Sequence, residues 1–208
     1  MMVKTIFWDF DGVILDSMKV RDWGFEQIFK SFKKEDIDRL LKYHRENGGL
    51  SRYVKIRYFF EELLSQSIEE EEVLVYAEKF SRLMRKELIN PSNLIVDSVK
   101  FIKNNFKRYN FHIVSGSDQE ELRFLCKELN INKYFSSING SPTDKSILIK
   151  NILNNHDISL ENCCLIGDSI NDFEAALKNK IKFYSYNNKK IIDLDSHIIN
   201  FSNFQPFN

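Results

Sequence analysis

The chain has 208 residues and carries 30 Lys and Arg against 30 Asp and Glu, so its formal net charge is zero. This balance excludes a strongly basic surface, and we expect neither nucleic acid nor an anionic membrane as a partner. Hydrophobic residues make up 43% of the chain, which excludes a disordered protein. Three cysteines are too few for a disulfide framework and predict a cytoplasmic protein with free thiols.

The first predicted element is a strand over residues 3–8, and a long helical segment follows it. Between residues 17 and 88 the sequence shows helical periodicity and no strand signal. We predict four helices there, over 18–32, 35–46, 51–64 and 68–88. The glycine pair at 48–49 is expected to end the second helix in a left-handed conformation. We therefore expect residues 17–88 to form a helical cap domain, and residues 1–16 with 89–208 to form the core domain.

The rest of the chain alternates predicted strands and helices. Strands are predicted over 109–115, 134–138, 162–167 and 181–184. Helices are predicted over 93–106, 118–129 and 144–153, and around 175–177. Ser117 and Glu120 have the spacing of a capping box for the second of these helices. Strands that are apolar on both faces and alternate with helices predict an α/β fold with a Rossmann-like parallel sheet at its core.

Carboxylates follow two of the predicted strands. Asp9 and Asp11 come after the first strand, and Asp168 and Asp172 come after the strand at 162–167. Because ligands of such sheets bind beyond the carboxyl ends of the strands, we expect these side chains to converge there. Carboxylates at short distance repel one another, and a divalent cation offsets that repulsion. An all-oxygen ligand set with open positions is typical of Mg²⁺.

Hydrogen-bond donors are predicted at the same edge of the sheet. Ser115 ends the strand at 109–115 and Gly116 follows it, and Lys145 begins the helix after the next strand. A hydroxyl, free backbone N–H groups and an ammonium can together bind a phosphoryl group. Lys150, a little over one helical turn further on, is the alternative to Lys145. Beside a metal-bound carboxylate, these groups indicate phosphoryl transfer.

Four sequence motifs occur in a recognisable order. They are DFDGV at 9–13, HIVSGS at 112–117, SPTDKS at 141–146 and GDSIND at 167–172. On these motifs the sequence resembles the haloacid dehalogenase superfamily of aspartate-nucleophile phosphatases. The helical insertion between the first two motifs resembles the cap of its phosphoglycolate-phosphatase and β-phosphoglucomutase branch. The lysine motif departs from the KP-x-P-D arrangement that is common in the phosphosugar members.

The resemblance implies a role for each aspartate. Asp9 would attack phosphorus and form an aspartyl-phosphate, while Asp11 would protonate the leaving oxygen and then act as a base on water. Mg²⁺ would be held by the Asp9 carboxylate, the Asp11 backbone carbonyl and Asp168. Asp172 would be a further ligand or a support through water, and the alternative is that it only caps its helix.

The resemblance also implies which residues bind the substrate. Ser115, Gly116 and Lys145 would bind the phosphoryl oxygens. In the cap, Arg52 and Lys55 follow the glycine-containing turn from which related caps reach the leaving group. The alternative interpretation, a solvated arginine at the start of a helix, stays open for Arg52.

Together these features predict a Mg²⁺-dependent phosphomonoester hydrolase for a small phosphorylated metabolite, either a sugar phosphate or a phosphoglycolate-like compound. We expect a monomer or a homodimer. Two alternatives remain: a phosphosugar mutase built on the same core, and a catalytically silent protein that binds phosphometabolites. A halide-releasing dehalogenase is disfavoured because it needs neither the second aspartate nor Mg²⁺, and a kinase because the chain has no G-x-x-x-x-G-K-[ST] loop.

Overall fold

The core of the protein is a six-stranded, fully parallel sheet in the order β3-β2-β1-β4-β5-β6. The computed structural model describes residues 4–155, 158–188, 197–201 and 203–204. The strands are β1 (Thr5–Trp8), β2 (Asn110–Asp118), β3 (Ser137–Ser141), β4 (Cys163–Gly167), β5 (Lys182–Ser185) and β6 (His197–Ile198). The predicted Rossmann-like α/β fold is confirmed.

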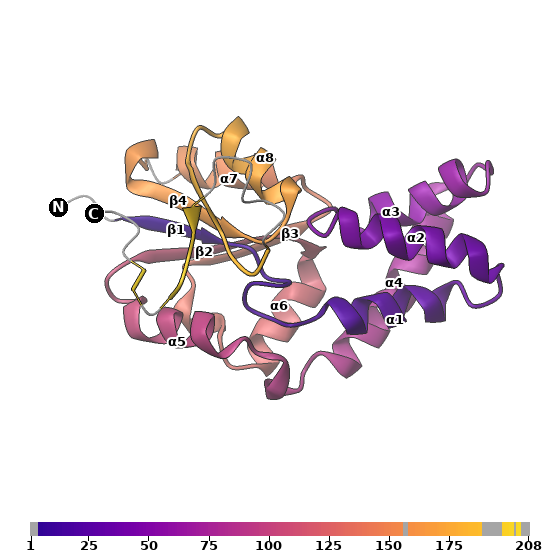
Figure 1. Ribbon diagram of the computed structural model, residues 1–208, viewed down its shortest axis with the longest axis horizontal. Helices are drawn as coiled ribbons and strands as arrows, with labels where there is room; N and C mark the ends of the chain where they lie inside the picture. Colours follow the sequence, from indigo (N-terminus) through magenta and orange to yellow (C-terminus); the bar gives the residue numbers. More distant parts are fainter. Residues whose placement is uncertain (1–3, 156–157, 189–196, 202, 205–208) are drawn as a thin grey trace.

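Helices cover both faces of the sheet, as Figure 1 shows. Helices α5 (Val96–Asn105) and α6 (Gln119–Glu128) lie on one face, and α7 (Lys145–Asn155) and α8 (Ile170–Lys178) lie on the other. Successive strand residues point to opposite faces. In β1, Ile6 and Trp8 therefore pack in the cluster that contains α5 and α6, whereas Phe7 packs in the cluster with α7 and α8. Burial on both faces explains why these strands read as continuous apolar runs.

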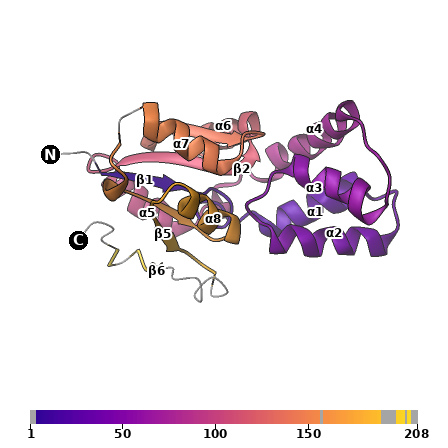
Figure 2. The ribbon, with the colours of Figure 1, turned by 90° about the horizontal axis from the view of Figure 1, so that it is seen from above.

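The segment between β1 and β2 forms a helical bundle beyond one end of the sheet (Figures 1 and 2). Its helices are α1 (Met18–Ile28), α2 (Lys34–Glu46), α3 (Arg52–Tyr58) and α4 (Glu70–Glu87), and a π-helical turn, Phe59–Leu63, continues α3. Aromatic rings fill the interior: Phe29 stacks on Phe59 at 4.2 Å, and Phe25 lies 4.5 Å from Phe80. The four predicted helices are all present.

Several predicted boundaries were wrong. The strand predicted over 134–138 lies at 137–141, because residues 132–134 form a short 3-10 helix. Ser117 does not cap α6: it belongs to β2, and Asp118 caps the helix by accepting hydrogen bonds from two backbone N–H groups. The glycine pair at 48–49 does not adopt positive φ, since Gly12 is the only glycine with positive φ in the part of the chain that the structure describes. Strand β6 was not predicted.

The strand order places a crevice between β1 and β4. From β1 the chain continues to β2 and β3 on one side of the sheet and later returns to β4 and β5 on the other side. In such sheets the crevice at the point of reversal, outside the carboxyl ends of the strands, is where ligands bind. The helical bundle follows β1 in the chain and lies beyond the carboxyl ends of the strands, the end of the sheet at which such a crevice opens (Figure 1).

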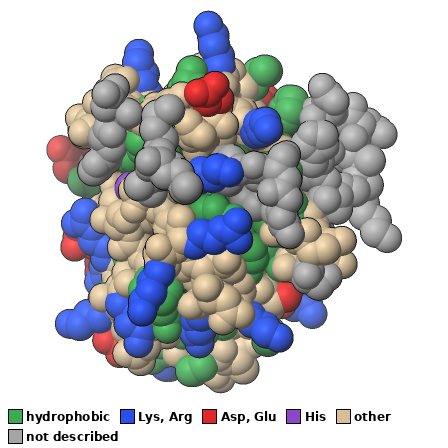
Figure 3. All heavy atoms as spheres, turned by 90° about the vertical axis from the view of Figure 1, so that its left-hand side faces the viewer, with side chains coloured by type: hydrophobic (Ala, Val, Ile, Leu, Met, Phe, Trp, Pro, Cys, Tyr) green, Lys and Arg blue, Asp and Glu red, His purple; other side chains and the backbone are tan. Residues whose placement is uncertain are grey.

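Figure 3 looks at the end of the core that is remote from the bundle. Figure 3 shows Lys and Arg side chains dispersed over this face among side chains of other kinds. None of the helices within the described ranges has both the length and the apolar character that crossing a membrane requires.

Candidate active site

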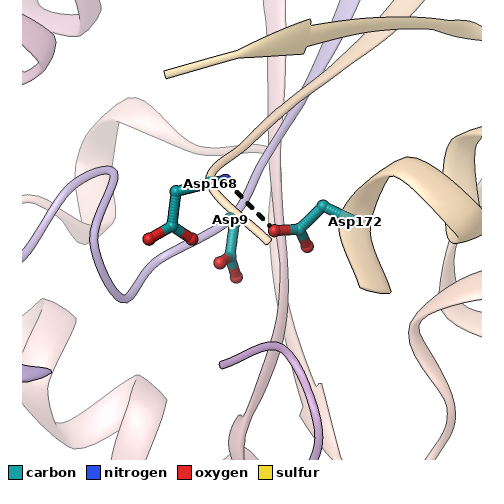
Figure 4. Close-up of side chains that lie close together, drawn as sticks. All are labelled: Asp9, Asp168 and Asp172. Carbon is teal, nitrogen blue, oxygen red and sulfur yellow. Dashed lines mark hydrogen bonds between the residues drawn. The ribbon is translucent and has the colours of Figure 1, made fainter. Parts of the chain in front are cut away.

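Three carboxylates meet at the crevice between β1 and β4. Asp9 directly follows β1, Asp168 directly follows β4, and Asp172 lies in the first turn of α8. One oxygen from each lies within 4.8 Å of the others. In Figure 4 the Asp9 and Asp168 carboxylates point the same way, and the dashed line marks the hydrogen bond from the Asp168 backbone to Asp172. The structure thus brings together three of the predicted site residues.

Gly12 allows the loop after β1 to pass close to Asp168. Its φ is +79°, a conformation that side chains other than glycine rarely adopt. A Cβ atom at this position would lie 2.0 Å from Oδ2 of Asp168. Any larger residue would therefore displace the carboxylate, which explains the glycine in the first motif.

Lys145 joins two of the carboxylates. Its Nζ lies 2.8 Å from Oδ1 of Asp9 and also donates a hydrogen bond to Oδ1 of Asp172. The side chain is buried at the start of α7, whereas Lys150, the alternative lysine, is exposed. The structure therefore places Lys145, and not Lys150, beside Asp9.

Asp172 is held by partners from its own loop. Its Oδ2 accepts hydrogen bonds from the backbone N–H groups of Asp168 (3.2 Å) and Ser169 (3.0 Å), and from the Ser169 hydroxyl (2.7 Å). Ser169 and Asp172 form a capping box for α8. With Lys145 on its other oxygen, Asp172 fixes both the Asp168 backbone and the lysine.

The electrostatics of this cluster favour a divalent cation. Burial and the charge of Asp172 raise the pKa of Asp9 to about 7. Burial and the charge of Asp9 raise the pKa of Asp168 well above its usual range. When all three carboxylates are ionised, the ammonium of Lys145 offsets one of them and two negative charges remain. The donors are all oxygen and the excess charge is that of one divalent ion, so the residues present fit Mg²⁺.

Asp11 has the opposite environment, although it is only two residues from Asp9. Its carboxylate accepts hydrogen bonds from the Ser17 hydroxyl, from Nε of Arg21 at 2.6 Å and from the Ser117 hydroxyl at 2.5 Å. Burial alone would raise the pKa of Asp11, but the charge of Arg21 and these hydrogen bonds hold it below its usual value. Asp11 therefore rests in its ionised form.

A buried glutamate of the core binds two arginines of the bundle. Glu121 in α6 is fully buried, and it accepts hydrogen bonds from Nη1 of Arg21 (3.2 Å) and Nη1 of Arg52 (2.6 Å). Arg52 also donates to the hydroxyl of Ser81 at 2.6 Å and lies over the ring of Phe80. At 4% exposure Arg52 is not a solvated arginine, so that alternative interpretation was wrong.

Lys55 lies next to these arginines. It is 2% exposed, and its Nζ is 3.3 Å from the carbonyl oxygen of Gly48. Lys55, Arg21, Arg52 and Asp11 line a cavity of about 20 Å³ between the bundle and the core. The two predicted cap residues thus line the same small pocket as Asp11.

Ser115 and Gly116 lie where the bundle touches the end of β2. Oγ of Ser115 accepts a hydrogen bond from the backbone N–H of Ser117 at 3.1 Å. A Cβ on Gly116 would lie 2.3 Å from the carbonyl oxygen of Gly49, so glycine is needed for this close approach. Gly116 also lines a larger cleft of about 250 Å³, which Lys145 borders from the other side. This cleft gives access to the lysine from outside.

Sequence reasoning missed the residues that surround Asp11. Arg21 and Glu121 lie within helices that were predicted, but no local pattern separates them from exposed charged residues of the same helices. Ser117 was assigned to a helix cap. The one signal that could have identified these two serines is their place in the sequence. Ser17 lies a few residues after the DFDGV motif, and Ser117 ends the HIVSGS motif.

A family model described as haloacid dehalogenase-like hydrolase matches residues 6–185. A search of curated proteins found no match.

Solved structures share the fold at low sequence identity. A predicted phosphoglycolate phosphatase from Haemophilus somnus is 15% identical with a TM-score of 0.72, covering 97% of this chain and 96% of that chain. A β-phosphoglucomutase from Clostridium difficile is 16% identical with a TM-score of 0.73, covering 96% and 91%. A magnesium-bound HAD-hydrolase from Bacillus subtilis, described as revealing interdomain movement, is 16% identical with a TM-score of 0.64, covering 90% of each chain. Identities this low show the fold alone.

Proposed function

The chain belongs to the haloacid dehalogenase-like hydrolase family, and we propose that it is a Mg²⁺-dependent phosphomonoester hydrolase for a small phosphorylated metabolite. The observation that carries this proposal is the setting of Asp9. Its carboxylate is buried at the carboxyl end of β1, 2.8 Å from the ammonium of Lys145 and beside the carboxylate of Asp168. A lysine and a bound cation beside the carboxylate would offset the negative charge of a phosphoryl group. The carboxylate can then attack the phosphorus.

The first step transfers the phosphoryl group to Asp9. A carboxylate oxygen of Asp9 attacks phosphorus, the bond between phosphorus and the ester oxygen breaks, and Asp11 gives its proton to the leaving oxygen. Asp11 rests ionised, and the negative charge of an arriving phosphoryl group raises its affinity for the proton that this step needs. Lys145, the Ser115 hydroxyl and the backbone N–H of Gly116 bind the phosphoryl oxygens.

The second step releases phosphate. Water attacks the phosphorus of the aspartyl-phosphate, Asp11 takes a proton from that water, and the bond between phosphorus and the Asp9 oxygen breaks. Inorganic phosphate leaves and the Asp9 carboxylate is regenerated. Asp11 then releases to solvent the proton that it took from water, which balances the proton that it took up before the first step. The hydrogen bonds from Arg21 and Ser117 favour the ionised Asp11 that this step uses as a base.

Mg²⁺ would be held by the carboxylates of Asp9 and Asp168 and by the backbone carbonyl of Asp11. When bound, it offsets the negative charge of the carboxylates and of the phosphoryl oxygens. The hydrogen bonds of Asp172 to Lys145 and to the 168–169 backbone support a role in orienting these groups, with any contact to the ion made through water.

We assign residues 17–88 to a cap domain that moves against a core domain of residues 1–16 and 89–208. Support comes from the cavity of about 20 Å³ beside Asp11, which has room for little more than one water molecule. A leaving group of several heavy atoms needs more space, so the two domains must separate to admit it. Closure then excludes bulk water from the reaction.

We also place the enzyme in the cytoplasm, as a monomer or homodimer without a nucleic-acid or membrane partner. Support for the compartment comes from the three cysteines, which are all buried free thiols. The zero net charge supports the proposal that neither nucleic acid nor an anionic membrane is a partner.

An aryl phosphate assay tests this proposal. Wild type should release phosphate in Mg²⁺ and lose this activity in a chelator, and the variant Asp9→Asn should be inactive in both. Asp16→Asn, a variant of an exposed aspartate of the same loop, is the matched control and should behave as wild type. Equal rates for wild type and Asp9→Asn would refute the nucleophile and favour a silent binding protein. Phosphate release that requires an added sugar bisphosphate would favour the mutase.

A further inference from the structure

Asp168 differs from the other two carboxylates of the cluster in how its side chain is held. Asp9 accepts a hydrogen bond from Nζ of Lys145, and Asp172 accepts hydrogen bonds from the same lysine and from its own loop. Within the part of the chain that the structure describes, no hydrogen bond or ion pair joins the Asp168 carboxylate to another side chain. The direction of this carboxylate therefore depends on its backbone and on the close packing against Gly12.

Two side chains hold the Asp168 backbone, one on each side of its Cα. The N–H group donates a hydrogen bond to Oδ2 of Asp172 at 3.2 Å, and the carbonyl oxygen accepts one from Nδ2 of Asn188 at 2.6 Å. Asn188 lies 20 positions further along the chain than Asp168. Because a residue has only two soft backbone dihedrals, fixing the peptide groups on both sides of its Cα sets the direction of its side chain.

The segment that carries Asn188 is itself attached to the end of β4. Ser185, the last residue of β5, pairs with Gly167, the last residue of β4. The hydroxyl of Ser185 donates a hydrogen bond to the backbone carbonyl of Asn188 at 3.2 Å. Asn187 has a φ of +57°, a left-handed conformation that asparagine tolerates better than most residues. This turn directs the chain back, so that the Asn188 amide reaches the residue that follows Gly167.

Asn188 lies at an accessible edge of the cluster. It is half-buried, and its neighbour Asn187 is exposed. Both residues line an open groove of about 590 Å³ together with Asp168 and Ser169. A variant without the Asn188 amide should fold, because water from the groove can hydrogen-bond to the freed carbonyl. Such a variant loses the fixed direction of the Asp168 backbone and keeps a satisfied acceptor.

We propose that Asn188 is a positioning residue of the cation site, and that its amide fixes the Asp168 backbone so that the carboxylate points the same way as that of Asp9 (Figure 4). This inference rests on the proposed function, because it takes Asp168 as a ligand of Mg²⁺. Asn188 acts through Asp168 and lies outside the four sequence motifs, in the segment after β5. Side chains that orient a metal ligand commonly change metal affinity by about 10- to 100-fold.

The stabilisation of the fold by Mg²⁺ measures this effect without any substrate. Urea unfolding in a chelator and in Mg²⁺ well above Kd gives the free energy that binding of the ion adds to unfolding. For Asn188→Ala we expect a Kd for Mg²⁺ about 10-fold higher than that of wild type, which lowers this added free energy by about 1.4 kcal/mol. If Asn188 only stabilised its loop, the variant would lose the same free energy of unfolding in Mg²⁺ and in the chelator.

Two aspartate variants separate position from charge. Asn188→Asp keeps the size of the side chain, but it replaces the amide donor with a carboxylate oxygen and adds a negative charge. We expect it to bind Mg²⁺ more weakly than wild type, because this oxygen repels the Asp168 carbonyl. Asn187→Asp is the matched control, since it adds the same charge in the same groove and leaves the hydrogen bond of Asn188 in place. Aspartate also tolerates the left-handed conformation, and the Kd of this control should equal or fall below that of wild type.

The possible results separate the inference from the proposed function. A wild-type Kd for Mg²⁺ in Asn188→Ala, with circular dichroism showing that the variant is folded, would overturn the inference and leave the proposed function intact. Tighter binding by Asn188→Asp would also overturn it, because charge and not the hydrogen bond would then govern the affinity. If Mg²⁺ does not stabilise even the wild-type protein, the Mg²⁺ site of the proposed function fails, and the inference fails with it.

Discussion

Asp9 and Asp11 are separated by a single residue, yet the two halves of the site around them have opposite charge. The acidic half consists of Asp9, Asp168, Asp172 and Lys145, with two negative charges in excess. The basic half consists of Arg21, Arg52, Lys55, Asp11 and Glu121, and its cations outnumber its carboxylates by one when Lys55 is protonated. The pKa of Asp9 is raised to about 7, and that of Asp11 is lowered. The excess of carboxylates in the acidic half fits a divalent cation.

The two halves also differ in how they are assembled. Every residue of the acidic half belongs to the core, at the carboxyl ends of β1 and β4 and the first turns of α7 and α8. The basic half takes its three cations from α1 and α3 of the bundle and its carboxylates from the core. The acidic half is therefore complete within the core, whereas the basic half needs contact between the bundle and the core.

The largest effect is expected from removing a charge of the acidic half. Asp168→Asn should lower kcat/KM about 10⁴-fold, because it weakens Mg²⁺ binding and the several kcal/mol of charge stabilisation that the ion supplies. Steady-state assays over a range of Mg²⁺ concentrations measure this loss, with Asp16→Asn as the control. A variant that keeps wild-type activity and Mg²⁺ dependence would show that Asp168 does not hold the ion.

The acidic half also predicts how metal-free stability depends on pH. A carboxyl whose pKa is raised from 3.8 to about 7 in the folded state stabilises the fold at low pH, and this stabilisation is lost as the pH rises through about 7. In a chelator the free energy of unfolding should fall by about 3 kcal/mol between about pH 5 and about pH 8. Mg²⁺ should restore most of it at the higher pH.

Urea unfolding at several pH values, with Mg²⁺ and with a chelator, measures the difference. The free energy of unfolding is compared with and without Mg²⁺ at each pH, so the pH dependence that comes from groups remote from the site cancels in the difference. A stabilisation by Mg²⁺ that is the same at about pH 5 and at about pH 8 would contradict the charge assigned to the acidic half.

In the basic half, Arg21→Met should lower kcat about 100-fold, because Arg21 positions Asp11 and general acid–base catalysis contributes about that much or more. The loss should be larger for alkyl phosphates, whose leaving oxygens need the proton, than for aryl phosphates, whose leaving groups do not. A merely structural role for Arg21 would lower both rates equally. Comparing the two substrate types in wild type and variant separates the two roles.

The smallest effect is expected at the edge of the cap–core contact. The hydroxyl of Tyr53 donates a hydrogen bond to Oδ2 of Asp118 at 2.8 Å. Tyr53→Phe should lower the free energy of unfolding by about 1 kcal/mol and leave kcat within about two-fold. Tyr58→Phe is the matched control, since its ring stacks on Tyr43 at 3.6 Å and the substitution keeps that stacking. A loss of activity as large as that of Arg21→Met would show that the Tyr53 contact controls closure.

The acidic half could be predicted from the sequence because strand ends fix it. Asp9 and Asp168 follow short apolar runs, and parallel strands bring such positions to one edge of the sheet. The Rossmann-like fold and the four helices of the insertion follow from the same local patterns. The strand predicted over 134–138 was misplaced because residues 132–134 form a 3-10 helix, which apolar periodicity does not reveal.

The basic half depends on contacts between residues that are far apart in sequence. Arg21 and Glu121 are 100 positions apart, and Arg52 and Glu121 are 69 apart. No local pattern specifies which face of α1 meets which face of α6, so Arg21 and Glu121 could not be singled out. Arg52 was found only through a family resemblance, and its burial against Glu121 needed the structure.

The central claim is that the Asp9 carboxylate becomes phosphorylated during turnover. Wild-type enzyme mixed with a phosphate-labelled substrate in Mg²⁺, quenched in acid within a single turnover and digested, should give one labelled peptide, with the phosphoryl group on Asp9. The label should be absent from Asp9→Asn and should disappear on longer incubation as phosphate is released. A chain that turns over substrate without ever carrying label, or that carries it on another residue, would contradict the account.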